Sequence, residues 1–266
     1  MARRSGWYAV MSVAMATLMS LSVAADIARD GLKAYWQFSE TTGTTVSDTT
    51  HTNPGTLLLG ATFATGKIGG GVAFDGAASY IDCGIHAEMA VSTALSIVAW
   101  VKAEPQTHYA AIVARCNGKA AEPKNIAYLF DIVPTGQVRG YVSDGTNYQR
   151  ITSKQKVNDG SWHHVVFVLG SSKLSIFVDG KSDQTPINRT LTPQPALSSD
   201  FHVFIGDAML SQPAWTFKGT IDELRVYSRA LTDAEVAQLY SEGKSVSAAP
   251  LAAVALLAGA SAYSFQ

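Results

Sequence analysis

Two pairs of neighbouring residues in this 266-residue chain are of types that could do chemistry. His163 and His164 are adjacent, as are Asp222 and Glu223, and both pairs lie in runs that read as β-strands. Neighbouring residues on a strand point to opposite faces, so the two histidines cannot bind one metal ion from the same side. For the same reason the two carboxylates cannot flank one glycosidic bond about 5–10 Å apart, as hydrolysis requires. We therefore expect one core histidine, one surface histidine and no enzyme.

Aromatic and polar residues in or beside the predicted loops form a second kind of candidate. Tyr148 lies beside Asn147, Tyr109 follows His108, and Trp215 is close to Gln212. Aromatic rings offer an apolar face on which a sugar ring can stack, and loops commonly carry binding contacts. The predicted ligand-binding residues are Arg115, Asn117, Asn125, Tyr148 and Trp215.

The elements that must position these residues are short strands separated by turns, from residue 31 to residue 230. Leu95–Val101 is apolar on both faces, which predicts a strand in the middle of a sandwich. Asp144-Gly145 and Asp179-Gly180 follow alternating runs, and Asp-Gly in that position predicts a hairpin turn. No helices alternate with these strands, and this arrangement favours a sandwich.

One helix is predicted after the last strand. Thr232 and Glu235 have the spacing of a capping box, and Gly243 is a natural helix stop. The predicted fold class is therefore all-β, an antiparallel sandwich with one short C-terminal helix, which the family resemblance described below specifies as a two-sheet jelly roll.

Composition and the chain ends favour an extracellular protein. The net charge is −1 and no basic stripe is present, which argues against nucleic-acid binding. A signal peptide is predicted over residues 1–25, because Arg3 and Arg4 precede an apolar run and small residues precede Asp26. The alternative is a signal anchor that is retained in the membrane. Residues 26–244 are predicted to form one domain. The apolar tail, residues 245–266, fits a membrane anchor, a cleaved anchor-attachment signal or a disordered tail, so a membrane tether is an open expectation.

Two covalent modifications are predicted, a disulfide between the two cysteines and glycosylation at the one sequon. Cys83 and Cys116 are expected to form a disulfide, because an oxidising compartment favours bridging, whereas two cysteines with scattered histidines do not make a zinc site. Asn188-Arg189-Thr190 is an acceptor sequence for glycosylation at Asn188.

Four segments, in order along the chain, resemble the laminin-G-like, concanavalin A-like lectin and glucanase jelly rolls. They are Phe74-Asp75-Gly76 with Tyr80-Ile81-Asp82, Leu95–Trp100, Trp162-His163-His164-Val165 with Leu174–Gly180, and Gly219–Tyr227 with Arg229-Ala230-Leu231. The resemblance covers roughly residues 31–241. It implies a jelly roll of about a dozen strands, pentraxin-like in shape, that binds carbohydrate or protein.

The resemblance also implies a structural calcium ion between an N-terminal loop and the last strand. Asp48 and Asp222 are the expected ligands, and the alternative is that Asp222 only accepts backbone N–H groups. Glycoside hydrolases of this fold carry several acidic residues at alternate positions of one strand, a run that is missing here. We expect a secreted or cell-surface, non-catalytic module that binds extracellular carbohydrate or protein. The alternatives are a structural or adhesive surface protein and, less favoured, a polysaccharide hydrolase.

Overall fold

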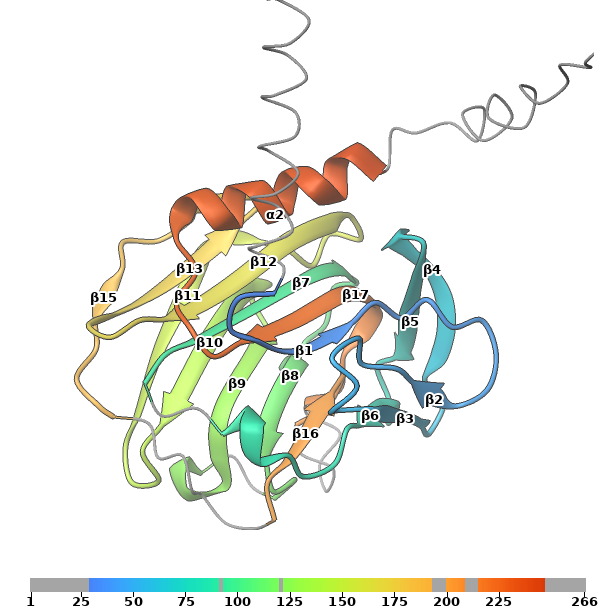
Figure 1. Cartoon of the computed structure of the whole chain (residues 1–266), viewed down its shortest axis with the longest axis horizontal. Coiled ribbons are helices and arrows are strands. Elements are labelled where there is room, and N and C mark those ends of the chain that lie inside the picture. The colour runs from blue at the N-terminus through green and yellow to red at the C-terminus, as the bar shows by residue number, and fades with distance from the viewer. Residues whose placement is uncertain (1–28, 91–92, 120–121, 193–199, 209–214, 247–266) are drawn as a thin grey trace, which may run out of the picture.

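The computed structural model describes residues 29–90, 93–119, 122–192, 200–208 and 215–246. Within these ranges, strands β1 to β17 form two antiparallel sheets of nine and eight strands, and a C-terminal helix lies against one of them (Figure 1). The predicted two-sheet sandwich with one C-terminal helix is confirmed, with more strands than the dozen implied by the resemblance. The predicted signal peptide and residues 247–266 of the tail lie outside the described residues. No helix in the described ranges has the length and apolarity to cross a bilayer.

The nine-stranded sheet, called sheet A, has the order β14-β13-β12-β7-β17-β5-β4, with β1 paired to β17 and β15 paired to β13. Its strands are β1 (Leu32–Trp36), β4 (Thr62–Ile68), β5 (Gly70–Asp75), β7 (Leu95–Ala103), β12 (Trp162–Leu169), β13 (Lys173–Val178), β14 (Lys181–Ser182), β15 (Ile187–Asn188) and β17 (Lys218–Tyr227). Strand β7 is central, as predicted, and every residue in it except Lys102 is buried.

The eight-stranded sheet, called sheet B, has the order β11-β10-β9-β8-β16-β6-β3-β2. Its strands are β2 (Thr45–Val46), β3 (Gly55–Leu58), β6 (Tyr80–Asp82), β8 (Ala110–Cys116), β9 (Ile126–Ile132), β10 (Gln137–Ser143), β11 (Tyr148–Lys156) and β16 (His202–Ile205). Two short 3-10 turns, η1 (Ala87–Met89) and η2 (Pro123–Asn125), interrupt the connections. Strands β8 to β11 are consecutive neighbours, so this half of the sheet is a meander of hairpins.

The core lies between the sheets and is filled by alternate residues of both. Phe130 of sheet B stacks on Phe167 of sheet A, with ring centroids 6.2 Å apart and an interplanar angle of 26°. Gly140 lies opposite Phe130 in the register of β10 and β9. A Cβ atom at Gly140 would come within 2.1 Å of the Phe167 ring. Glycine is therefore required there for the ring to reach the backbone of sheet B.

Helix α2 (Asp233–Val246) covers the outer face of sheet A. Its capping box is confirmed, since the Glu235 backbone N–H donates to Thr232 Oγ1 at 3.3 Å and the Thr232 N–H donates to Glu235 Oε2 at 2.7 Å. The helix continues through Gly243, so the expected stop there is wrong. A Cβ atom at Gly243 would lie 2.5 Å from the Trp100 ring, which shows that this glycine serves close packing.

The expected disulfide is not formed, because Cys83 and Cys116 are both buried free thiols. Cys83 follows β6 and Cys116 ends β8, and strand β16 runs between these two strands. Two strand spacings amount to about 9–10 Å, whereas bridged cysteines have Cα atoms less than about 7 Å apart. The two side chains also belong to different apolar clusters. Burial raises the pKa of the Cys116 thiol to about 12, so it stays protonated at neutral pH.

Candidate ligand-binding groove

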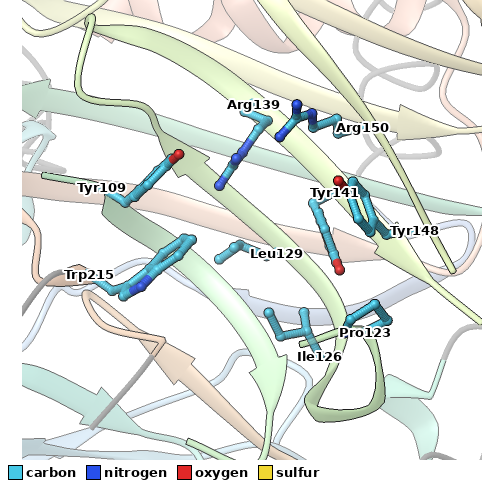
Figure 2. Close-up of a pocket in the computed structure, with 9 residues that line it drawn as sticks. All are labelled: Tyr109, Pro123, Ile126, Leu129, Arg139, Tyr141, Tyr148, Arg150 and Trp215. Atoms are coloured by element: carbon cyan, nitrogen blue, oxygen red, sulfur yellow. The ribbon is translucent and has the colours of Figure 1, made fainter. Parts of the chain in front are cut away.

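A groove of about 280 Å³ lies on the outer face of sheet B, the face turned away from the core (Figure 2). It is lined by Tyr109, Pro123, Ile126, Leu129, Arg139, Tyr141, Tyr148, Arg150 and Trp215. Strands β9, β10 and β11 supply its floor and one wall. Residues before β8, in η2 and before β17 supply the rest.

Strand register explains why these side chains share one face. Tyr141 lies directly opposite Leu129 on one side and Arg150 on the other, and Arg139 lies opposite Asp131. Residues directly opposite each other in an antiparallel pair point to the same side of a sheet. The intervening residues, such as Gly140, point into the core.

The first wall of the groove is a stacked aromatic pair. The rings of Tyr109 and Trp215 lie 4.4 Å apart at an interplanar angle of 11°. The Arg139 guanidinium lies 4.6 Å from the Tyr109 ring centroid and 5.7 Å from that of Trp215. Cation–π contacts of this kind contribute about 0.5–2 kcal/mol and hold the rings in place.

The opposite wall is a second aromatic pair. Tyr141 and Tyr148 stack with centroids 5.1 Å apart at 18°, and the Arg150 guanidinium lies 5.8 Å from the Tyr148 ring. Figure 2 shows the two pairs on either side of Leu129, which forms the floor. Burial raises the pKa of Tyr141 to about 12, so its hydroxyl stays protonated. Tyr148 is 48% exposed, which is unusual for a large aromatic residue and marks a candidate contact surface.

A buried ion pair fixes Arg139 beneath the groove. Its Nε donates to Asp131 Oδ1 at 3.0 Å and its Nη2 donates to Asp131 Oδ2 at 2.5 Å. Burial lowers the pKa of Arg139, but the Asp131 carboxylate raises it by more, so the guanidinium stays charged. A two-point pair of this kind sets the orientation as well as the charge.

The predicted ligand-binding residues divide into two sets. Tyr148 and Trp215, far apart in the sequence, lie on opposite walls of the same groove. Arg115 lies opposite Tyr128 in the register, so it points into the core and is only 4% exposed. Asn117 and Asn125 bind each other, with Asn117 Nδ2 donating to Asn125 Oδ1 at 3.0 Å. These three residues do not line the groove.

Arg139, Tyr141 and Arg150 also line the groove, although they are not among the residues predicted from the sequence. Their signal was available in principle, because Arg139 and Tyr141 are two residues apart on a predicted strand and therefore share a face. Arg150 joins them only through the register of the next hairpin. Tyr109 is one of the aromatic residues that the sequence places beside a loop.

Asp48 organises its own loop through hydrogen bonds. Its Oδ1 accepts the Tyr35 backbone N–H at 2.7 Å, and its Oδ2 accepts the Asn53 backbone N–H at 3.0 Å, together with the Thr50 hydroxyl. Burial raises the pKa of this carboxyl, but the hydrogen bonds from Thr50, Tyr35 and Asn53 lower it by more. Both oxygens are already supplied with donors.

Asp222, in β17 of sheet A, is fully buried and also accepts hydrogen bonds from backbone N–H groups. Ile68 donates to its Oδ2 at 2.8 Å and Glu223 donates to its Oδ1 at 2.7 Å. Among the described residues, no group of three or more His, Cys, Asp or Glu could hold a metal ion. The donors present on Asp48 and Asp222 do not fit a calcium ion, which needs six to eight oxygen ligands. Structural calcium therefore stays a prediction of the sequence.

The acidic pair Asp222-Glu223 departs from the expected alternation. The register shifts between Asp222 and Arg225, and Glu223 has a positive φ of 52°. This bulge turns Glu223 to the outer face of sheet A, where its Oε2 accepts hydrogen bonds from the Tyr35 hydroxyl at 2.5 Å and from Arg225 Nη2 at 2.7 Å. The two carboxylates thus share a face, but they are 0% and 5% exposed and neither lines the groove.

The histidine pair does point to opposite faces, but neither side chain is exposed. His163 contacts Asp179 at 3.0 Å and Asp159 at 3.2 Å, and the hydrogen bond to Asp179 is the largest cause of its raised pKa. His164 lies under α2 with its ring 5.2 Å from that of Trp100, because the helix covers the face expected to meet solvent.

Asn188 and Thr190 of the sequon are exposed, and glycosylation stays a prediction.

Two antiparallel sheets packed face to face, with one C-terminal helix, define the class as a β-sandwich. Residues 74–237, more than half of the chain, match the family model Laminin_G_3, described as the concanavalin A-like lectin/glucanases superfamily. The chain belongs to this family. Among curated proteins, none matches this sequence.

Solved structures share this fold at low sequence identity. Domain 4 of AbnA, a GH43 extracellular arabinanase from Geobacillus stearothermophilus in complex with arabinotriose, superposes with a TM-score of 0.59 at 23% identity, covering 79% of this chain and 98% of that domain. The binding domain of Paraclostridial Mosquitocidal Protein 1 has a TM-score of 0.60 at 12% identity, covering 80% of this chain and 52% of that one. Trypanosoma rangeli sialidase has a TM-score of 0.56 at 17% identity, covering 81% of this chain and 34% of the enzyme. These similarities show the fold.

Proposed function

We propose that this protein is a non-catalytic binding module that recognises an extracellular carbohydrate in the groove of sheet B. The observation that carries the proposal is the pair of aromatic stacks, Tyr109–Trp215 and Tyr141–Tyr148, on opposite walls of one groove. Flat apolar rings beside guanidinium groups suit a sugar, which presents an apolar ring face and hydroxyl groups. The structure of the AbnA domain with arabinotriose, at 23% identity, supports a saccharide ligand for this fold.

The chemistry of the groove supports binding over hydrolysis. Its nine lining residues include no Asp or Glu. The nearby Asp131 is fully buried and paired with Arg139. Most glycosidases need two carboxyl groups that can reach the scissile bond.

A glycan array with the purified protein tests the proposal, followed by calorimetric titration of the best saccharide. Trp215→Ala and Tyr148→Ala should each weaken binding about tenfold or more, because each removes a stacking surface. Tyr80→Ala is a matched control, since Tyr80 packs on Phe204, centroids 5.9 Å apart, outside the groove. Unchanged affinity in both groove variants would refute this placement of the site.

We also propose that the protein is secreted or held at the cell surface. The predicted signal peptide and the extracellular arabinanase among the structural matches support this location. N-terminal sequencing of the mature protein should begin near Asp26, and the full-length protein should leave the cytoplasm. Retention of residues 1–25 on a cytoplasmic product would contradict the proposal.

A further inference from the structure

We propose that the groove prefers an acidic saccharide, one that carries a carboxylate, over its neutral counterpart, and that Arg150 makes this distinction. The inference rests on the proposed function, because it assigns the chemical class of the ligand in the same groove. It also predicts which wall of the groove holds the acidic ring.

The charges around the groove do not balance. Two arginines, Arg139 and Arg150, line it, and none of the described residues that line it is acidic. Asp131 neutralises Arg139 through the two-point ion pair beneath the floor. Arg150 is exposed, and none of the ion pairs found in the described parts of the chain includes it. Asp131 also feels the charge of Arg150, so two guanidinium groups share one carboxylate and the groove keeps a net positive charge, with Arg150 at the exposed rim.

Arg150 is placed where a bound sugar would present its substituents. It lies directly opposite Tyr141 in the register, and its guanidinium is 5.8 Å from the Tyr148 ring. Figure 2 shows it beside this tyrosine pair. A sugar ring stacked on Tyr148 would bring a carboxylate on its edge within reach of the guanidinium. A planar guanidinium can bind a carboxylate through two parallel hydrogen bonds, which a hydroxyl group cannot match.

The second aromatic pair implies a ligand of at least two sugar rings, one for each side of the groove. Tyr109 and Trp215 lie across Leu129 from the tyrosine pair (Figure 2). The guanidinium near them, Arg139, is already paired with Asp131. The acidic ring therefore belongs on the Tyr141–Tyr148 side, and a neutral ring fits the Tyr109–Trp215 side.

The test compares saccharides that differ only in charge. Oligogalacturonate and its methyl ester form one matched pair, and sialyllactose and its methyl ester form a second. In at least one pair we expect the acidic member to bind about 10- to 100-fold more tightly, the effect of one hydrogen-bonded charge. The preference should shrink as the salt concentration rises, because Arg150 is exposed.

Variants then locate the preference. Arg150→Gln should remove the preference, so that the acidic and the neutral member bind this variant with equal affinity, whatever the variant does to the affinity for both. Arg150→Lys should retain part of the preference, because lysine keeps the positive charge but cannot bind a carboxylate through two parallel hydrogen bonds. Lys154→Gln is the matched control, since Lys154 is an exposed cation on the same strand that does not line the groove.

The outcomes separate this inference from the proposed function. Equal or tighter binding of the neutral member in every pair overturns the acidic preference and leaves carbohydrate binding standing. Binding to no saccharide on the array, acidic or neutral, overturns both. An equal loss in Lys154→Gln and Arg150→Gln overturns the assignment to Arg150.

Discussion

The two outer faces of the sandwich carry similar aromatic residues but differ in what covers them. On sheet A, Trp100 stacks on Tyr240 of α2 with centroids 5.6 Å apart at 23°, and the helix buries the surrounding valines. On sheet B, Tyr109 stacks on Trp215 at 4.4 Å, and no helix within the described ranges covers the groove. The same residue types thus complete the fold under a helix on one face and line a groove on the other, where Tyr148 is 48% exposed and Tyr141 and Trp215 are each 8% exposed. Stability should therefore depend on the first face and ligand binding on the second.

The largest expected effect is on the covered face. Leu239 of α2 is 3% exposed and packs against sheet A, so Leu239→Ala should lower the free energy of unfolding by about 2–5 kcal/mol. Groove affinity should not change while the protein stays folded. Urea denaturation and calorimetric titration measure the two quantities. Tyr148→Ala should show the reverse pattern, with a stability loss of no more than about 1.5 kcal/mol from the lost ring stack on Tyr141. Weaker ligand binding by folded Leu239→Ala would show that the faces are coupled.

The covered face should also produce opposing pH effects. Burial, followed by the charge of Arg225, lowers the pKa of His164 to about 3, whereas burial raises the pKa of Asp222 to about 7. Between about pH 4 and pH 6.5, folding therefore releases a proton at His164 and takes one up at Asp222. Rising pH stabilises the fold through His164 and destabilises it through Asp222.

Single variants should separate these two effects. In Asp222→Asn the free energy of unfolding should rise with pH more steeply than in the unchanged protein. In His164→Phe the free energy of unfolding should fall as the pH rises. Each slope should differ from the unchanged protein by up to about 1.4 kcal/mol per pH unit. Urea denaturation at several pH values across this window provides the slopes. Parallel slopes in all three proteins would show that neither group titrates as described.

A smaller effect is expected at the start of the covering helix. Thr232→Ala removes the side-chain oxygen that accepts the Glu235 N–H, and it should cost about 1 kcal/mol of stability. Ser241→Ala, an exposed position in the last turns of the same helix, is the comparison. Thermal melting distinguishes the two variants. An equal, negligible loss in both would mean that the capping box does not hold the helix on sheet A.

The smallest expected effect concerns calcium. The N–H donors already on Asp48 and Asp222 predict a melting temperature unmoved by chelator. A fall in melting temperature with chelator, reversed by added calcium, would restore the structural ion implied by the family resemblance.

Local signals in the sequence predicted much of the fold. The apolar run of β7 and the Thr232–Glu235 capping box depend on near neighbours, and both appear where expected. Properties that depend on strand order were not accessible in the same way. Strand β16 comes late in the chain and inserts between β6 and β8, which separates Cys83 from Cys116. The sequence does not reveal such a long-range pairing.

The groove shows the same division. Tyr148 and Trp215 could be picked out because aromatic residues beside loops are conspicuous. Their meeting across Leu129 required the hairpin registers. Arg115 flanks a long loop between strands, which predicts a binding contact, yet the register places it opposite Tyr128 and turns its side chain inward. A bulge at Glu223 likewise overrode simple alternation.

Gly140 has a consequence for the thermodynamics of recognition. It lies between Arg139 and Tyr141 and lets the Phe167 ring of the other sheet support the groove floor from below. The side chains above it are held by an ion pair and by ring stacking, so they have little rotational freedom to lose. The entropy lost on complex formation should then come mainly from the saccharide, and a conformationally restricted oligosaccharide should bind more tightly than a flexible one.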